Sequence, residues 1–417
     1  MSSGNLVKPK DASHFFWNDS LDPDQFASAR YRVTSHFSGE DTAIGMAMEQ
    51  SASTLDIAGF VTQDMLEHST IRIKEVQELS ETLTASGVPD FHLNTEVYNE
   101  GNRQGWRSYL VELAVPAWLL NGKPAQLLNV LVGELPRLGF LTTFRLVDVQ
   151  LPPGFGPGPS FGRAGILGLL NKDKGPILCR AMRPGVGLDV ETMAALNLET
   201  LRGGFHLVKD DELIEFSDNE AFRKHALRMI RARDEAMQET GEKKLYIANL
   251  FCEPQELARR WETALELGVD AVLVAPFIQG LGVLPYLARQ AEVPVLAHNS
   301  FVDLLTRNRT WGIDDEVICH WIRHLGGDWF VTPGTFAAAE MDIEKCRSLM
   351  SVATRDEGGL RDMMPNLQGG KHPGGLRGYI DAVGDRSFML IVANWIDSHP
   401  DGLLQGAKEF RQALDDL

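Results

Sequence analysis

The sharpest chemical feature of the sequence is the run Lys209-Asp210-Asp211-Glu212. Carboxylates are the ligands that a hard cation such as Mg²⁺ prefers, so Asp211 and Glu212 could bind one. An ammonium group cannot ligate a metal, but Lys209 would supply an oxygen ligand if CO₂ carbamylated its amine. The alternative is a solvated charge run at a helix start, where acidic residues favour the helix dipole.

Two further residues and one loop could act on a substrate. His298 directly follows the apolar run Val293–Ala297, and a histidine at a strand end can be a base, a phosphate donor or a metal ligand. Arg183 precedes Pro184 and could hold an anionic group through a bidentate contact. The glycine-rich stretch Gly369–Gly375 offers backbone amides and a cation to a phosphate. A structural histidine, a surface arginine and a plain loop are the respective alternatives.

The elements that would position these residues follow a βα rhythm from residue 151 to residue 417. Eight short apolar segments alternate with helical patterns, and they are Pro176–Met182, Phe205–Val208, Leu245–Leu250, Ala271–Ala275, Val293–Ala297, Trp329–Thr332, Ser351–Thr354 with Asp362–Met364, and Phe388–Val392. This pattern predicts a (β/α)₈ TIM barrel, whose sites lie at the carboxyl ends of the strands. A doubly wound sheet is the alternative, but no GxGxxG motif follows the first strand, which also argues against an NAD-dependent oxidoreductase.

Polar residues follow most of these strands and are the candidates for a site. They are Arg183, Lys209–Glu212, Asn249, His298, Asn299, Thr332, Gly334, Thr335, Asn366, Gln368, Gly369, Gly370, Lys371, His372, Asn394, Asp397 and His399. Because the carboxyl ends of barrel strands surround one opening, we expect many of these side chains to meet there.

Residues 1–150 lack this βα repeat. Their strand and helix patterns predict a separate α+β domain of ferredoxin-like type. Strands are expected at Tyr31–Phe37, Ser108–Val115, Gln126–Val132 and Val147–Leu151, and a helix from Asp41–Met48 onward. The Pro- and Gly-rich segment Pro152–Gly162 marks the boundary between the two domains.

Composition narrows the class of protein. The chain has 417 residues, a net charge of −17 and 44% hydrophobic residues, which predicts a soluble globular protein. The charge argues against binding to nucleic acid or to an anionic membrane, and no apolar run is long enough to span a bilayer. Its 4 cysteines form no CxxC pair, so we expect isolated thiols in a cytoplasmic protein.

Together these motifs resemble those of a known protein family. The segment Gly203–Glu212 resembles the carbamylated-lysine motif of the ribulose bisphosphate carboxylase (RuBisCO) large subunit. The order of the flanking motifs agrees, and these are Met182–Leu188, Leu296–His298, Gly326–Asp328, Pro333–Thr335 and Gly369-Gly370. The resemblance extends from about Tyr31 to about Gly406, and its departures make the chain similar to the RuBisCO-like proteins (form IV).

The resemblance implies a set of site residues. Lys209 would be carbamylated and would hold Mg²⁺ together with Asp211 and Glu212, with His298 near the substrate. The residues implied to bind substrate are Glu49, Thr54, Glu134, Arg183, Asn299, Gln368, Gly369 and Gly370. In this family the N-terminal domain reaches the site of a neighbouring subunit, so a homodimer is implied.

The departures from the family bear on function. Arg183 replaces the lysine that moves the enolisation proton in the carboxylase, and arginine is a poor base. Alanine near Ala339 replaces the loop-six lysine, Asn299 replaces an arginine and Gln368 replaces a serine of one phosphate site. The glycine-rich end of strand eight is also altered, in Ile391–Pro400.

These departures argue against carboxylation of a bisphosphate. The resemblance instead implies a Mg²⁺-dependent enzyme that forms an enediolate from a small phosphorylated sugar or sugar acid, of the enolase/isomerase or decarboxylase type. The catalytic residues would be Lys209, His298 and Arg183, with the carbamate or His298 as base. The alternatives are a non-catalytic or regulatory member of the family and a true carboxylase. Retention of all three metal residues favours the enzyme.

Overall fold

The computed structural model describes residues 12–51, 62–84, 105–331 and 342–417, which form two compact units. The first unit comprises Met1–Phe155 and Leu304–Ile318, and the second comprises Gly156–Asp303 and Cys319–Leu417. The expected boundary at 150/151 thus lies slightly before the point where the two units divide. The inclusion of Leu304–Ile318 in the first unit was not anticipated from the sequence.

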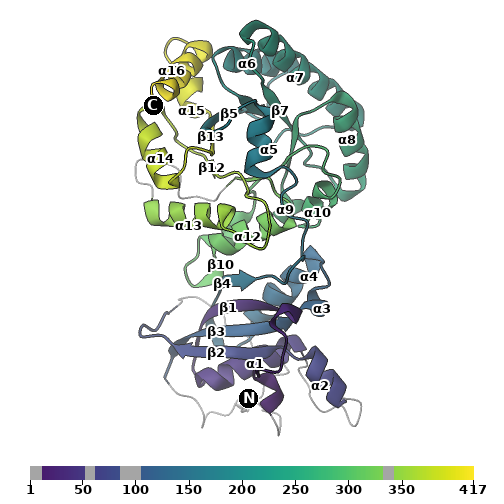
Figure 1. Ribbon diagram of the computed structural model, residues 1–417, viewed down its shortest axis with the longest axis vertical. Helices are drawn as coiled ribbons and strands as arrows, with labels where there is room; N and C mark the ends of the chain where they lie inside the picture. The colour runs from purple at the N-terminus through teal and green to yellow at the C-terminus, as the bar shows by residue number, and fades with distance from the viewer. Residues whose placement is uncertain (1–11, 52–61, 85–104, 332–341) are drawn as a thin grey trace. The chain divides into compact units, whose positions relative to one another are not determined.

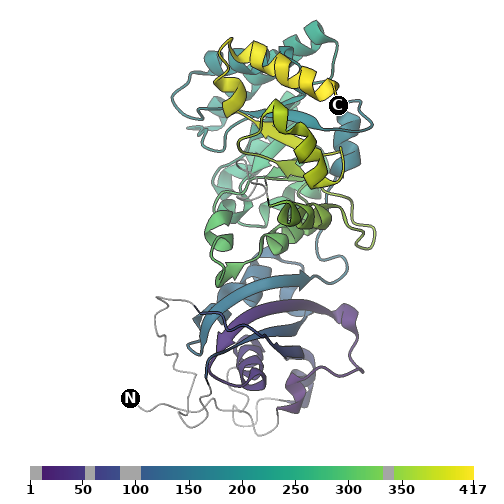
Figure 2. The same ribbon diagram turned by 90° about the vertical axis from the view of Figure 1, so that its left-hand side faces the viewer.

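The first unit is built on a twisted sheet. Its elements are β1 (Phe26–Ser35), α1 (Gly39–Ser51), α2 (Gln63–Ser69), β2 (Arg72–Glu78), β3 (Arg107–Pro116), α3 (Ala117–Leu120), α4 (Pro124–Leu128), β4 (Leu141–Gln150) and β10 (Trp311–Ile313). The order β4-β1-β3-β2 is antiparallel throughout, and β10 adds in parallel at the β4 edge. Helix α1 lies against the sheet, as the turned view shows (Figure 2). The element order is that of the split βαβ arrangement.

One expected strand of this unit is wrong. Gln126–Val132 is helical, because it contains the end of α4 and a π-helical turn at Asn129–Gly133. Pro124 occupies the first turn of α4, where its missing N–H costs nothing. Leu127, Val130 and Leu131 are buried, and their i, i+3, i+4 spacing is that of one helix face.

The second unit is an eight-stranded parallel barrel surrounded by helices (Figure 1). Its strands are β5 (Ile177–Ala181), β6 (Leu207–Lys209), β7 (Leu245–Asn249), β8 (Ala271–Val274), β9 (Val295–Ala297), β11 (Trp329–Phe330), β12 (Asn366–Leu367) and β13 (Met389–Val392). They pair in chain order, β13 returns to β5, and a bridge from Trp329 to Met364 nearly closes the ring. The predicted TIM barrel is therefore confirmed.

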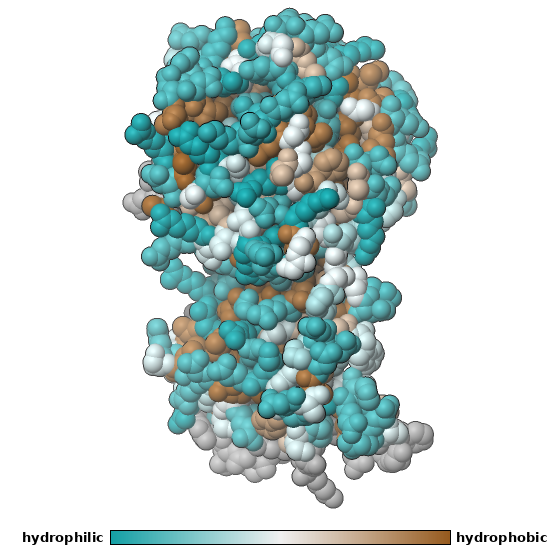
Figure 3. Space-filling view, in the orientation of Figure 1, coloured by the Kyte–Doolittle hydropathy of each residue, from teal (hydrophilic) through white to brown (hydrophobic). Residues whose placement is uncertain are grey.

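Twelve helices of the described chain accompany the barrel strands, and capping residues mark the ends of some of them. They are α5 (Gly162–Leu169), α6 (Val190–Arg202), α7 (Asn219–Thr240), α8 (Pro254–Leu267), α9 (Pro276–Gln279), α10 (Val283–Ala288), α11 (Val302–Thr306), α12 (Asp315–Leu325), α13 (Ile343–Thr354), α14 (Leu376–Val383), α15 (Asn394–Asp397) and α16 (Leu403–Asp415). Asp189 and Asp218 accept backbone N–H groups at the starts of α6 and α7, and Gly241 ends α7 in the left-handed conformation. In the space-filling view, hydrophilic residues predominate along the rim of this unit, where these helices lie (Figure 3).

The expected strand at Ser351–Thr354 is also wrong. These residues form the last turn of α13, in which Cys346, Leu349, Met350 and Ala353 are buried at helical spacing. The seventh strand is β12, which contains only Asn366 and Leu367. An apolar run of four residues is too short to distinguish a strand from a buried helix segment by its periodicity, and here the strand was the wrong choice.

The interior of the barrel is filled by alternate residues of its strands. The inward-facing cluster includes Cys179, Leu207, Ile247, Leu273 and Leu296, and α5 packs Ile166, Leu167 and Leu170 beneath it. Because side chains alternate along a strand, the residues two positions after these core residues face the carboxyl mouth of the barrel. No helix in the described part of the chain is long and apolar enough to cross a membrane.

Asp328, at the start of β11, ties helix α5 to the barrel. Its buried carboxylate accepts N–H groups from Phe161 (2.8 Å), Gly162 (2.7 Å) and Val295 (2.9 Å). We expect Asp328→Ala to lower the free energy of unfolding by about 2–4 kcal/mol, because three buried donors lose their acceptor. Urea unfolding measures this, with Glu262→Ala on the exposed side of α8 as the control. Equal stability of the two variants would contradict the assignment.

Candidate active site

The end of β6 places the lysine of the Lys-Asp-Asp-Glu run in the mouth of the barrel. Lys209 is the last residue of β6, two positions after the core residue Leu207, and is level with Ala181 and Ile247 on the neighbouring strands. Its side chain is buried, and its Nζ donates to the carbonyl of Asp210 (3.0 Å). Lys209 Nζ lies 3.7 Å from Glu212 Oε2, so an amine and a carboxylate meet there.

Asp211 and Glu212 are held in the turn that follows β6. Asp211 is fully buried, and its Oδ1 accepts the N–H of Leu213 (3.1 Å). Gly185 makes this burial possible, since a Cβ on Gly185 would lie 2.3 Å from Asp211 Oδ1. Burial and the neighbouring Glu212 raise the pKa of Asp211, while the Leu213 N–H and Arg183 oppose that rise.

Arg183 and His298 complete the charged group. Arg183 Nε is 3.0 Å from Asp211 Oδ2, and Arg183 Nη2 is 3.7 Å from Glu212 Oε1. His298 Nε2 is 3.2 Å from Glu212 Oε2, while its Nδ1 accepts the backbone N–H of Ser300 (3.2 Å). The proton of the neutral ring therefore resides on Nε2. Burial, with the charges of Lys209 and Arg183, lowers the pKa of His298 to about 3, so the imidazole is neutral at pH 7.

A cavity of about 800 Å³ joins these residues to loops seven and eight. Among the residues that line it are eight that the sequence analysis named for the site, and they are Arg183, Lys209, Glu212, His298, Asn299, Gln368, Gly369 and Gly370. Other residues of the wall include Lys371, His372, Asn394, Trp395 and Ser398. The strand-end rule found Lys371, His372 and Asn394, whereas Trp395 and Ser398 were missed because they lie in and after α15 rather than at a strand end.

Arg180, buried in β5, fixes two walls of this cavity. Its Nε donates to Asp397 of α15 (2.9 Å), and its Nη2 donates to the carbonyl of Arg183 (3.3 Å). One guanidinium therefore holds both the first loop and the short helix that follows the eighth strand. Such charged hydrogen bonds are among the stronger ones in proteins.

The implied residues of the N-terminal domain lie in the first unit. Glu49 of α1 and Glu134 both pair with Arg137, at 3.3 and 2.5 Å respectively, so one arginine gathers the two carboxylates. Neither residue lines the cavity of the barrel. Thr54, Thr335 and the segment around Ala339 lie outside the described residues.

Asp210, for which the sequence suggested no role, fixes the Lys209–Glu212 segment through hydrogen bonds to neighbouring elements. Its Oδ1 lies 2.9 Å from His225 Nε2 of α7, and its Oδ2 accepts from Tyr246 Oη (2.6 Å) and the Asn249 N–H (3.1 Å). Asn249 in turn donates its side-chain amide to the carbonyl of Ile214 (3.0 Å). The partners come from α7 and β7, so no local pattern in the sequence could reveal them.

Comparison with known proteins identifies the family. The family model described as "Ribulose bisphosphate carboxylase large chain, catalytic domain" matches residues 164–417. A protein named "Ribulose bisphosphate carboxylase" from Archaeoglobus fulgidus is 31% identical over 333 residues, which cover 74% of this chain and 75% of that protein. The chain therefore belongs to the RuBisCO large-chain family.

Two further comparisons place it beside RuBisCO-like members. A protein named "2,3-diketo-5-methylthiopentyl-1-phosphate enolase" from Geobacillus kaustophilus is 28% identical over 312 residues, covering 73% of this chain and 75% of that protein. The crystal structure of a rubisco-like protein from Burkholderia fungorum superposes with a TM-score of 0.80 at 21% identity, covering 94% of each chain. The expected resemblance to RuBisCO-like proteins and the expected fold are confirmed.

The His225–Asp210 pair gives a pH dependence. Burial lowers the pKa of His225, but the charge of Asp210 and their hydrogen bond raise it above 6.5 overall. The protonated pair therefore stabilises the fold fully below about pH 6.5, and this contribution is lost as the pH rises through the folded-state pKa. We expect His225→Gln to cost more free energy of unfolding at about pH 6 than at about pH 9.

Urea unfolding of the variant and the parent at both pH values measures the difference. Tyr246→Phe is the matched control, because it removes another partner of Asp210 that does not titrate in this range. Its cost should be the same at both pH values. An equal cost of His225→Gln at the two pH values would mean that His225 is neutral in the folded protein.

Proposed function

We propose that the chain is a Mg²⁺-dependent enzyme that forms an enediolate from a phosphorylated sugar or sugar acid. The reaction would be of the enolase/isomerase or decarboxylase type and would not fix CO₂. The observation that carries the proposal is the meeting of Lys209, Glu212 and His298 in one cavity with Arg183 at the position of the carboxylase lysine. The relative named as an enolase supports the same class of reaction.

The donor set fits a magnesium ion. Asp211 Oδ2 and Glu212 Oε2 are buried and accept no hydrogen bond, and both are the hard oxygens that Mg²⁺ prefers. CO₂ bound as a carbamate on Lys209 would turn a cation beside Glu212 into a third oxygen ligand. When bound, Mg²⁺ would stabilise negative charge developing on carbonyl and hydroxyl oxygens of the substrate.

The proton chemistry favours one of the two candidate bases. The Nδ1 of His298 accepts the N–H of Ser300, so the Nε2 that faces Glu212 carries the ring proton and cannot accept another. We therefore assign the base to the Lys209 carbamate and give His298 the role of a hydrogen-bond donor. Glu212 Oε2 lies 3.2 Å from the Nε2 of this histidine.

The remaining wall suits an anionic substrate with one phosphate or none. Gly369 and Gly370 both have left-handed φ angles (71° and 56°), which brings backbone amides close together in loop seven. Asn299 and Gln368 add amide groups, which are neutral hydrogen-bonding partners. Arg183 is half-exposed and always charged, and a substrate carboxylate bound to it would favour the decarboxylase over the enolase or isomerase reaction.

A homodimer is part of the proposal. Exposed apolar side chains follow four barrel strands at the same end as the cavity, and they are Val186, Leu213, Ile278 and Phe301. Apolar groups gathered at one end of a domain mark an interaction surface. Glu49, Thr54 and Glu134 would reach the site of the neighbouring subunit from there, as the family resemblance implies.

Proton exchange tests the function. The protein is incubated in D₂O with Mg²⁺ and bicarbonate against singly phosphorylated ketoses and 3-oxo sugar acids, and NMR follows deuterium uptake and CO₂ release. We expect one class of substrate to react, and Lys209→Ala to slow it roughly a thousandfold, because the metal contributes several kcal/mol. Lys209→Arg keeps the positive charge but forms no carbamate, so it should be as inactive.

Two results would overturn the proposal. Absence of turnover on the whole panel, with no Mg²⁺ binding by calorimetry, would favour a non-catalytic member of the family. Full activity of Lys209→Arg would exclude the carbamate as base and ligand.

Arg183 gives a second test on the same substrate. We expect Arg183→Lys to raise KM about tenfold with a small effect on kcat, because a bidentate contact to an anion is lost while a positive charge remains. Steady-state kinetics separates the two parameters. A fall in kcat at unchanged KM would instead place Arg183 in the chemical step.

A further inference from the structure

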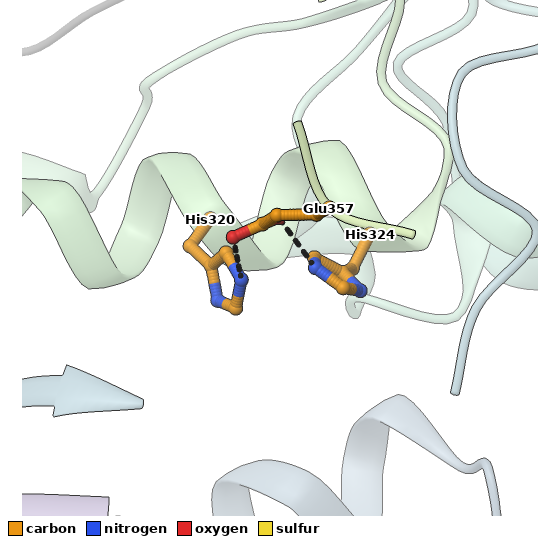
Figure 4. Close-up of side chains that lie close together, drawn as sticks. All are labelled: His320, His324 and Glu357. Atoms are coloured by element: carbon orange, nitrogen blue, oxygen red, sulfur yellow. Dashed lines mark hydrogen bonds and ion pairs between the residues drawn. The ribbon is translucent and has the colours of Figure 1, made fainter. Parts of the chain in front are cut away.

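Three side chains suited to a transition metal meet at the opposite end of the barrel from the cavity. His320 and His324 lie one turn apart on α12, and Glu357 projects toward them from the loop after α13 (Figure 4). That loop leads from a helix into β12, so it belongs to the amino end of the barrel. We propose that His320, His324 and Glu357 form a binding site for a divalent ion of the Zn²⁺ type.

The three side chains lie close enough to share one ion. Glu357 Oε1 lies 3.3 Å from His320 Nε2, and Glu357 Oε2 lies 3.0 Å from His324 Nε2. With metal–ligand bonds of about 2.0–2.1 Å, neighbouring ligands of tetrahedral zinc lie about 3.3 Å apart. All the candidate ligand atoms are within 4.8 Å of one another, and among the described residues this is the one such group of His, Cys, Asp and Glu.

The ligand chemistry differs from that of the candidate active site. Two imidazoles and a carboxylate favour Zn²⁺, Co²⁺ or Ni²⁺, whereas the oxygens of Asp211 and Glu212 favour Mg²⁺. The i, i+4 spacing puts both histidines on one face of α12. Three protein ligands leave a fourth position for water.

Arg323 organises the loop that carries Glu357 before any ion binds. Its fully buried guanidinium donates to the carbonyls of Val352 (3.0 Å), Leu360 (3.1 Å) and Arg361 (3.1 Å). These bonds clamp both ends of the loop onto α12. Glu357 and His324 are partly exposed, so an ion can reach the group from solvent.

Two arginines compete with a metal ion for the carboxylate of Glu357, and this competition provides a test. Arg355 Nε pairs with Glu357 Oε1, and Arg323 Nη1 lies 3.6 Å from Glu357 Oε2. Without an ion, the Nε2–H groups of the two histidines donate to the same carboxylate and span the same distances. A metal would replace those two protons and would compete with Arg355 for Glu357 Oε1. Removal of the Arg355 charge should therefore strengthen metal binding at this site.

Calorimetry with untagged full-length protein tests the proposal. The protein is titrated with Zn²⁺ in excess Mg²⁺, and with Co²⁺ while visible absorption reports the coordination. We expect one site per chain, with affinity lowered about a hundredfold in His320→Ala or His324→Ala and raised several-fold in Arg355→Gln. His68→Ala removes an exposed histidine on α2 and should have no effect.

Glu212→Gln separates this site from the catalytic one. It removes a proposed Mg²⁺ ligand, so Zn²⁺ binding at α12 should survive while Mg²⁺ binding fails. Loss of Zn²⁺ binding in Glu212→Gln, or unchanged binding in both alanine variants, would overturn the proposal. If the alanine variants fold poorly, Arg355→Gln at an exposed position still tests the site. Weaker Zn²⁺ binding by this variant would also overturn the proposal.

Discussion

Two carboxylates are buried beside each other at the end of β6, and their charge must be balanced inside the protein. Asp211 and Glu212 meet this constraint through the cations Arg183 and Lys209. Burial of an unpaired charge costs several kcal/mol, so the cations and the acids must be built together. Three other contacts hold this group in place. Gly185 packs closely against Asp211, Tyr246 donates to Asp210, and Arg180 donates to the carbonyl of Arg183.

The same charge balance bears on the proposed change of chemistry within the family. Replacement of a lysine by Arg183 keeps a cation next to Asp211, so the acids remain compensated. It also removes a titratable amine, because a guanidinium does not lose its proton in proteins. In the proposed enzyme the site would keep its charge balance, and the base would have to be a group other than residue 183.

The sequence predicted the barrel and much of the cavity wall, because both depend on local patterns. Lys209 is the last residue of β6 and His298 directly follows β9, and residues at the carboxyl ends of barrel strands surround the mouth. The errors arose where local signals are ambiguous: Gln126–Val132 and Ser351–Thr354 are apolar runs whose helical spacing was mistaken for strand. The Asp210 network and the Arg137 bridge between Glu49 and Glu134 join residues distant in the sequence, which periodicity cannot pair.

The segment Leu304–Ile318 leaves the barrel between β9 and β11 and gives the first unit its edge strand β10. There Arg145 of β4 donates to the carbonyls of Thr306 and Ile313 (3.0 Å each) and pairs with Asp314. A fragment that ended at Phe155 would leave this buried guanidinium without those acceptors. Neither unit is thus a contiguous piece of chain, and a chimera that exchanges one of them with a relative needs three junctions rather than one.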